Sequence, residues 1–238
     1  MAKCCHDLDL IQSYANSKCD SVTSVGNLCY FKHENAPQGA TEKCVDCPNI
    51  NTCPYSARRI YVDGWNEAGR PEFAWPWNKV YPAFPLTEDG LYEGIKNSRY
   101  GKCVYKSGVD VVDHQLVQMT FENGVHASLK MTFGATPGRR MTFYCTLGEL
   151  QFDERLDTIE IMPFGQPAKV INLKDIVLGG GQMGHGGGDL ELIRNLYDEL
   201  TGLKPERTSL AESLESHLMG IAADESRKSG GTLVKVHE

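Results

Sequence analysis

The 238-residue sequence lacks the features that mark several specialised classes of protein. It has no basic surplus, because 24 Lys and Arg stand against 31 Asp and Glu, so it carries no electrostatic footprint for nucleic acid or an anionic membrane. No apolar run approaches the roughly 20 residues that span a bilayer, and residues 1–20 lack the apolar segment of a signal peptide. The sequence as given therefore predicts a cytoplasmic protein.

The common catalytic signatures are missing as well. The sequence contains no GxSxG elbow, P-loop or kinase motif set. The run Gly179–Gly184 has the letters GxGxxG, but a second run, Gly186–Gly188, follows at once and a predicted helix then leads to another helix. A dinucleotide fingerprint needs a βαβ unit, so we reject this match. The segment is either a glycine-rich loop that presents His185 to a cleft or a plain flexible connector.

Nine cysteines are present, and their odd number without a secretion signal argues against a disulfide framework. Cys44, Cys47 and Cys53 form a CxxC pair with a third thiol close by, which is a spacing that suits a structural zinc. Reduced or partly oxidised cysteines remain the alternative. Catalytic zinc is disfavoured, because no HExxH or three-His pattern accompanies the thiols. A structural zinc needs a fourth ligand, for which the sequence offers these candidates: Cys5, Cys29, His33 and Cys103.

Alternating hydrophobicity predicts a largely antiparallel sheet. We expect one strand across Val22–Phe31 and a hairpin of Leu116–Phe121 with Val125–Phe133 around a type I′ turn at Asn123-Gly124. Further strands, joined by connections too short for parallel crossovers, are expected at Met141–Thr146, Glu149–Asp153, Thr158–Met162, Lys169–Leu173 and Thr232–Val236.

The remaining chain is helical or irregular. Helices are expected over the first residues, over Asp189–Thr201 and after the capping-box pattern Ser209–Glu212, the last with Leu210, Leu214, Leu218 and Ile221 facing inward. Residues 32–100 are rich in Pro, Gly, Asn and aromatic residues and predict a long irregular insertion that holds the cysteine cluster. The predicted class is α+β: one domain over residues 1–238, with a large, mainly antiparallel open sheet and helices on one face.

Two positions could carry acid–base chemistry. His6 and Asp9 lie three residues apart, so a helix places them on one face, where a carboxylate could orient a proton-accepting imidazole. The alternative is a helix start in which Asp7 and Asp9 complement the dipole and His6 is incidental. Asp113 and His114, at the start of the predicted hairpin, either bind turn amides and each other or lie beside a pocket.

Several stretches together resemble the C-terminal domain of the glucose–fructose oxidoreductase, inositol dehydrogenase and rhizopine-catabolism family (Gfo/Idh/MocA). The matching stretches, in order, are Lys3–Asp9, Cys44–Tyr55, Tyr100–Tyr105, Asp110–Gln115, Thr146–Leu150 and Gly184–Asp189. The resemblance covers nearly the whole chain, and the order and spacing of the stretches make it specific.

The resemblance implies an NAD- or NADP-dependent oxidoreductase whose N-terminal Rossmann domain is absent from this sequence. The chain would supply the pocket for a sugar, polyol or related hydroxy compound, form homo-oligomers through its sheet, and be inactive alone. His6 and Asp9 match a family His and Asp at the hydride-transfer site. Where the family commonly has Asp four residues before that His, this chain has Ala2, with Lys3 beside it as a candidate for part of the proton transfer.

The same resemblance gives a pocket lined by four side chains: Tyr100, Asp113, His114 and His185. The alternative function is non-catalytic: a carbohydrate-binding or oligomerisation domain, with or without zinc to organise it.

Overall fold

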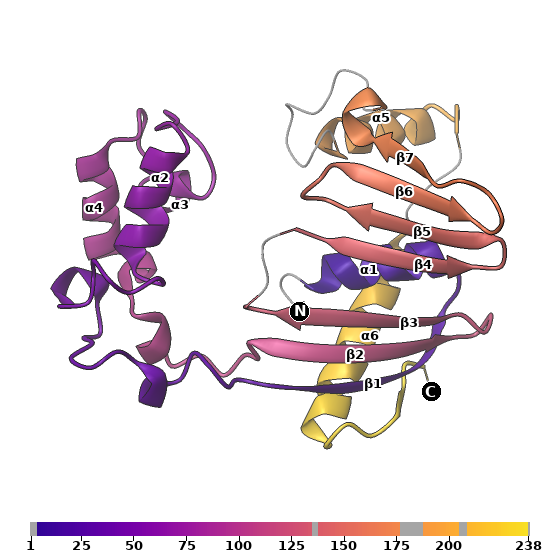
Figure 1. Cartoon of the computed structure of the whole chain (residues 1–238), viewed down its shortest axis with the longest axis horizontal. Helices are drawn as coiled ribbons and strands as arrows, with labels where there is room; N and C mark the ends of the chain where they lie inside the picture. Colours follow the sequence, from indigo (N-terminus) through magenta and orange to yellow (C-terminus); the bar gives the residue numbers. More distant parts are fainter. Residues whose placement is uncertain (1–3, 135–137, 177–187, 205–208, 238) are drawn as a thin grey trace. The chain divides into compact units, whose positions relative to one another are not determined.

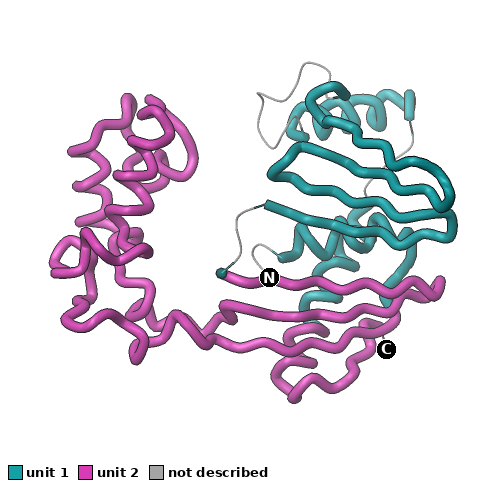
Figure 2. The backbone as a smooth tube through the Cα atoms, viewed as in Figure 1, with its two compact units in different colours: residues 1–19, 134–221 teal, residues 20–133, 222–238 magenta. Residues whose placement is uncertain are grey.

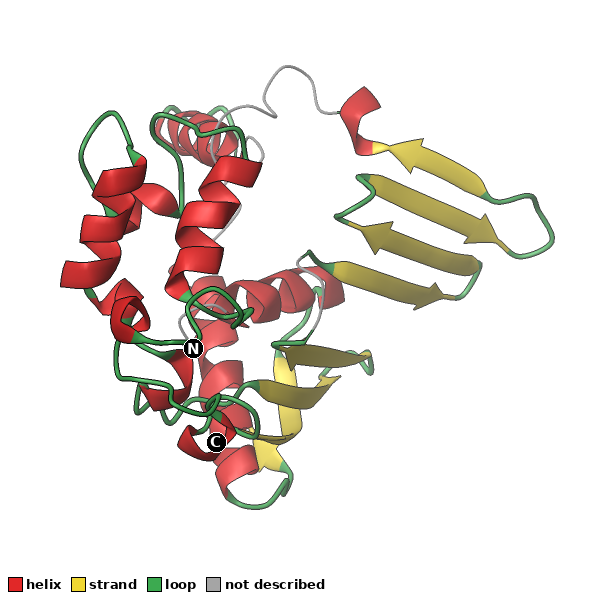
Figure 3. Cartoon of the chain, turned by 60° about the vertical axis from the view of Figure 1, so that its left-hand side comes forward, coloured by secondary structure: helices red, strands yellow, loops and turns green. Residues whose placement is uncertain are grey.

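The computed structural model describes residues 4–134, 138–176, 188–204 and 209–237. The chain forms two compact units, residues 1–19 with 134–221 (unit 1) and residues 20–133 with 222–238 (unit 2), coloured separately in Figure 2. In the described ranges each unit holds a four-stranded sheet together with helices. The predicted α+β class with a mainly antiparallel open sheet is therefore confirmed (Figure 3).

Unit 1 contains a sheet of order β4-β5-β6-β7. Its elements are α1 (Cys4–Ala15), β4 (Arg140–Cys145), β5 (Gly148–Asp153), β6 (Thr158–Pro163), β7 (Lys169–Asn172), the 3-10 turn η6 (Leu173–Asp175), α5 (Gly188–Leu200) and the first part of α6 (Leu210–Lys228). All three pairings are antiparallel, as the short connections predict. The register aligns Phe143 with Leu150 and Leu150 with Ile161, and Tyr14 of α1 packs edge-on against Phe143.

The sheet of unit 2 has the order β3-β2-β1-β8. Its strands are β1 (Cys19–Asn27), β2 (His114–Phe121), β3 (His126–Thr132) and β8 (Val234–Lys235). One face of β2 is buried through Val117, Met119 and Phe121, as the alternation predicts.

The turn of the β2–β3 hairpin differs from the predicted type I′ turn. A type I′ turn requires positive φ at both central residues, whereas only Gly124, with φ of 86°, is left-handed here. The Gly124 N–H donates to the Phe121 carbonyl, and the Phe121 N–H donates to the Val125 carbonyl. The hairpin therefore closes through a three-residue loop whose last position is a left-handed glycine.

The first strand begins and ends earlier in the chain than predicted. β1 ends at Asn27, and residues 28–31 leave the sheet. The reason is local: the backbone N–H groups of residues 29–31 donate to the Asp113 carboxylate and are not available to a strand partner.

Between β1 and β2 lies the predicted insertion, which is more helical than its composition indicates (Figure 1). Its elements are η1 (His33–Asn35), η2 (Cys44–Asp46), the π-turn η3 (Arg58–Asp63), α2 (Gly64–Glu67), α3 (Trp77–Val80), α4 (Glu88–Asn97), η4 (Arg99–Gly101) and η5 (Val104–Lys106). We call residues 28–113 the excursion. It has its own buried cluster: Cys44, Ala57, Val62, Trp65, Val80, Leu86, Leu91 and Ile95.

Helix α6 begins at the predicted capping box. The Ser209 N–H donates to Glu212 Oε2 at 2.7 Å, and the Glu212 N–H donates to Ser209 Oγ at 3.1 Å. The predicted inward face was wrong, because Leu210, Leu214 and Ile221 are 85%, 54% and 56% exposed. The buried positions are Glu215, Ser216, Met219, Ala222, Ala223 and Ser226.

The buried polar groups of α6 are hydrogen-bonded, which explains why a partly polar face can lie inside. In unit 1, Glu215 Oε1 accepts the Cys19 N–H at 2.8 Å. In unit 2, Ser226 Oγ accepts the Ser24 N–H at 2.8 Å and donates to the Thr232 carbonyl at 2.6 Å. Among the described residues, no helix has both the length and the apolar character needed to cross a membrane.

Candidate functional site

The predicted site residues fall in both units. His6 and Asp9 lie on α1 in unit 1, whereas Tyr100, Asp113 and His114 lie in unit 2. Lys3 and His185 lie outside the described residues.

The α1 pair is positioned by the start of a helix. His6 is exposed, with its Nδ1 3.2 Å from Cys5 Sγ, and Asp9 is half-buried. No hydrogen bond or ion pair joins His6 to Asp9 in the described structure. The carboxylate that is engaged is Asp7, whose Oδ1 accepts a 2.6 Å hydrogen bond from Arg139 Nε. Hydrogen bonding to Asp7 raises the pKa of Arg139. The sequence indicated Asp7 only as a charge near a helix start, because Arg139 is 132 positions away.

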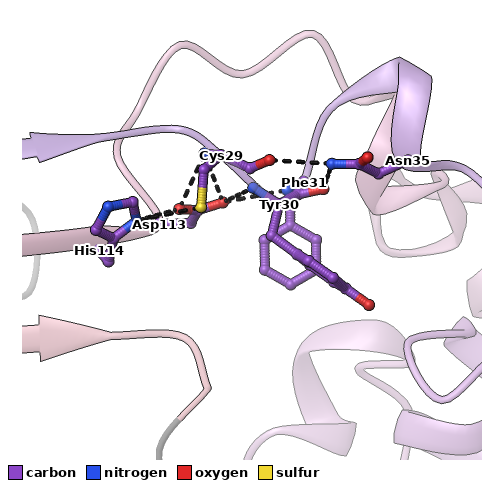
Figure 4. A network of polar contacts seen from close by, with 6 residues as sticks. All are labelled: Cys29, Tyr30, Phe31, Asn35, Asp113 and His114. Atoms are coloured by element: carbon purple, nitrogen blue, oxygen red, sulfur yellow. Dashed lines mark hydrogen bonds and ion pairs between the residues drawn. The ribbon is translucent and has the colours of Figure 1, made fainter.

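Asp113 is the centre of a polar network at the start of β2 (Figure 4). Its side chain accepts three consecutive backbone N–H groups: Cys29 at 3.1 Å, Tyr30 at 2.6 Å and Phe31 at 3.1 Å. His114 Nδ1 lies 2.9 Å from its Oδ1. The prediction that Asp113 binds nearby amides and His114 is therefore confirmed, although the partner amides come from a segment that the sequence assigned to a strand.

The network keeps Asp113 ionised inside the protein. Only 6% of the residue is exposed, and burial alone would raise its pKa. Hydrogen bonds from His114 and from the amides of Tyr30, Cys29 and Phe31 outweigh burial and hold the pKa well below its usual range. Asp113 thus joins the end of β1 to the start of β2 through a carboxylate that is ionised at neutral pH.

His114 is oriented by this carboxylate. An ionised carboxylate can only accept, so the 2.9 Å contact requires the proton on Nδ1. Nε2 then carries a lone pair, and the imidazole side chain is 40% exposed. In this geometry Nε2 is the ring atom that can accept a proton.

Cys29 completes a three-residue cluster with Asp113 and His114, whose ligand-type atoms lie within 4.8 Å of one another. The cluster fits a metal poorly. Asp113 already accepts four hydrogen bonds, and His114 directs Nδ1 to it. Burial, followed by the contact with Asp113, raises the pKa of Cys29, which disfavours the thiolate that a metal would bind.

Aromatic rings pack beside this network, and no pattern in the sequence indicates that they converge here. Tyr30 stacks on Phe133 with ring centroids 4.7 Å apart, and the Tyr105 hydroxyl donates to the Tyr30 hydroxyl at 3.4 Å. Tyr30, Phe31, Tyr55, Tyr105 and Phe133 form the group. Aromatic surface beside a few oriented polar groups is typical of small-molecule sites.

Tyr100 has different neighbours. Its ring meets Tyr61 edge-on at 5.8 Å, the Arg99 guanidinium lies 5.4 Å from its centroid, and it packs against the buried cluster of the excursion. These contacts share no residue with those of Asp113. The three predicted metal ligands, Cys44, Cys47 and Cys53, line one small cavity of the excursion together with Cys103.

The chain shares its fold with several solved oxidoreductases. A levoglucosan dehydrogenase in complex with NADH matches 99% of this chain with a TM-score of 0.56 and 14% identity, and its complex with NADH and levoglucosan gives a TM-score of 0.54. A putative NADPH-dependent oxidoreductase from Desulfitobacterium hafniense matches 99% of the chain at 11% identity, with a TM-score of 0.51. No protein-family model and no curated protein matches the sequence.

The match covers only part of each of these proteins. This chain spans 49% of the levoglucosan dehydrogenase and 47% of the D. hafniense protein. The identities are too low to transfer an activity, so the likeness is one of fold. The chain therefore has the same fold as about half of each of these solved oxidoreductases, which is what the resemblance seen in its sequence implies.

Proposed function

We propose that this chain is the C-terminal, substrate-binding domain of an NAD(P)-dependent oxidoreductase that acts on a sugar, polyol or related hydroxy compound. The observation that carries the proposal is the fold match over 99% of the chain to half of a dehydrogenase solved with NADH and levoglucosan. The sequence motifs that run in family order from Lys3 to Asp189 support it independently.

The described part of this chain does not itself fit a dinucleotide. Such a site needs a parallel βαβ unit with a glycine turn, and the strand pairs of known register here are antiparallel. The GxGxxG letters at residues 179–184 lie outside the described residues. We therefore assign the cofactor mainly to a second, Rossmann-type domain, and the isolated chain is inactive.

In this proposal His6 accepts the proton of the substrate hydroxyl. The imidazole is exposed on the first turn of α1. In this proposal Asp9 orients His6, and Lys3 takes over part of the proton transfer. His6 would hold the proton that leaves the substrate hydroxyl, and an oxidised nicotinamide, when bound, would supply the acceptor for the hydride that leaves the adjacent carbon. His185, Asp113, His114 and Tyr100 are the proposed pocket residues.

Calorimetry tests the domain assignment. We expect the isolated 238-residue chain to bind no NADH, whereas the full-length protein that contains it binds NADH with a measurable heat. Tight NADH binding by the isolated chain would show that the assignment is wrong. Levoglucosan and a panel of polyols, titrated into both proteins, test the substrate class.

Kinetics of the full-length protein test His6. We expect His6→Ala to lower kcat/KM by roughly 10²- to 10⁴-fold, the usual contribution of a positioned acid or base. His126→Ala is the matched control. His126 is also exposed, but it lies on β3, where its Nδ1 is 3.3 Å from Thr120 Oγ1. A His6→Ala protein with unchanged kcat/KM would remove His6 from the mechanism.

A second candidate for the proton acceptor is His114. Its specific support is the 2.9 Å contact to ionised Asp113, an orientation that His6 does not have. His114→Gln keeps a polar side chain without a titratable nitrogen. If His114 is the base, this variant lowers kcat and removes the acid limb of the pH–rate profile. If both variants keep wild-type kinetics, the non-catalytic carbohydrate-binding or oligomerisation domain is the better description.

A further inference from the structure

Four cysteines from distant parts of the excursion converge on one cavity. Cys44, Cys47 and Cys53 come from the turns that precede η3, and Cys103 comes from the segment between η4 and η5. An isolated antiparallel bridge between Lys43 and Lys102 joins the two backbone segments that carry Cys44 and Cys103. The Cys103 N–H also donates to the Glu42 carbonyl at 2.9 Å.

We propose that Cys44, Cys47, Cys53 and Cys103 bind one structural zinc ion, with Cys103 as the fourth ligand that the sequence left open. The other lining residues supply no imidazole and no carboxylate: Pro37, Ala40, Asn49, Ile50, Tyr55, Ser56, Val104 and Tyr105. A ligand set of four thiolates is typical of a closed structural zinc site.

The cavity has room for a single ion. Its volume is about 20 Å³, which is room for one water-sized sphere. The four sulfur atoms do not all lie within 4.8 Å of one another, unlike the ligand-type atoms of Cys29, Asp113 and His114. The sulfur atoms must therefore move closer together to reach Zn–S distances of about 2.3 Å.

The four sulfurs lie away from bulk solvent. Cys44 and Cys103 are buried, and Cys47 and Cys53 are half-buried. Limited solvent access of this kind suits a closed structural site that has no open coordination position.

Other candidate ligands from the sequence have other positions. Cys29 contacts Asp113 and His114, and Cys5 contacts His6. His33 begins η1 and is not among the residues of the cavity. Cys103 is therefore the fourth ligand that the geometry supports.

Metal analysis of the purified full chain tests the site. We expect about one zinc per chain in the wild-type protein and in Cys145→Ser, whose thiol is exposed on β4. Cys103→Ser should lose most of the zinc, to below about a tenth of an equivalent. Cys103→His should keep it, because imidazole is an accepted zinc ligand. Less than about half an equivalent in the wild type, or full zinc in Cys103→Ser, would overturn the proposal.

Two measurements need no variant, so misfolding of Cys103→Ser cannot obscure the answer. X-ray absorption of the zinc protein should show four sulfur ligands at about 2.3 Å and no nitrogen or oxygen ligand. Cobalt substituted for zinc should give the intense charge-transfer bands of a tetrahedral tetrathiolate. A nitrogen or oxygen ligand, stoichiometric iron in place of zinc, or a disulfide among the four cysteines by non-reducing mass spectrometry would each contradict the assignment.

Discussion

Asp113 shows how several hydrogen bonds can stabilise one buried charge and hold distant segments of the chain together. A carboxylate in a protein interior is costly unless its acceptor capacity is used, and here three amides and an imidazole use it. The sequence predicted that this Asp would bind turn amides, but it could not say which ones, because Cys29 lies 84 positions earlier.

Replacing Asp113 by Asn should lower the free energy of unfolding by about 2 kcal/mol or more at neutral pH, because hydrogen bonds to a charged group are lost. Denaturant unfolding followed by circular dichroism measures the change. Asp110→Asn, at an exposed position three residues earlier, is the control and should be neutral.

We also expect Asp113→Asn to change how the free energy of unfolding depends on pH. The pKa of Asp113 is lowered on folding, so the unfolded chain binds more protons in acid. The stabilisation is therefore complete above about pH 4 and is lost as the pH falls below it. Asp113→Asn should lose stability less steeply than the wild type below about pH 4. Equal slopes for the two proteins would contradict the role of the charge.

Two helical glycines offer a second test at the scale of single residues. A Cβ on Gly94 of α4 would lie 2.3 Å from the Val80 carbonyl oxygen, whereas a Cβ on Gly64 would meet nothing closer than 3.7 Å. We expect Gly94→Ala to destabilise by roughly 1–3 kcal/mol through overpacking, and Gly64→Ala to be neutral or stabilising by up to about 1 kcal/mol. Thermal unfolding of both variants checks this, and equal stability would mean that α4 can move away from Val80.

At the scale of elements, local patterns predicted the strands well. The four strands of unit 1 were located to within one or two residues, because alternation and turn residues agree there. The buried face of α6 was predicted wrongly, since the rule that leucines face inward was overridden by hydrogen bonds that bury Glu215, Ser216 and Ser226. Tertiary partners of this kind leave no periodic signal in a sequence.

The capping box of α6 should contribute measurably to its stability. Ser209→Ala and Glu212→Ala each remove one of the reciprocal hydrogen bonds at the first turn, and each should cost about 0.5–2 kcal/mol. Each of the two side chains accepts a hydrogen bond from the backbone N–H of the other residue. The double variant should therefore lose less stability than the sum of the two single variants. Ser229→Ala, at an exposed position just after the helix, should cost nothing. Strict additivity in the double-mutant cycle would argue against reciprocal capping.

At the scale of the whole molecule, the sequence predicted the class and the resemblance but not the division into units. Residues 1–19 join residues 134–221, a grouping that short-range patterns cannot indicate. Prediction of the candidate site was limited in the same way. Asp113 and His114 are neighbours in sequence, whereas Cys29, Tyr30 and Phe133 are brought to them by tertiary folding.

We predict that the protein forms a homo-oligomer through the sheet of unit 1, which carries exposed apolar side chains. Tyr144 of β4 is 83% exposed and Leu147, in the β4–β5 turn, is 81% exposed. Burying such side chains against a second copy is favourable, so light scattering after size exclusion should give a multiple of the 26.4 kDa chain mass. Tyr144→Glu should shift the protein toward the monomer, whereas Val125→Glu, an exposed apolar residue in the β2–β3 turn, should not. A monomeric wild-type chain would contradict this prediction.

The excursion also sets how the sheet of unit 2 can form. β1 and β2 are neighbours in the sheet, yet the residues that join their ends through Asp113 are 84 positions apart. Pairing of β1 with β2 across so long a loop is slow, because the chain loses the entropy of loop closure before the stabilising contacts form. An excursion that collapses early around its own helices brings the two ends together. The order of events in folding is then helices of the excursion first and the β1–β2 ladder afterwards, which pulse-labelled hydrogen exchange would record as early protection of α4 and late protection of β1.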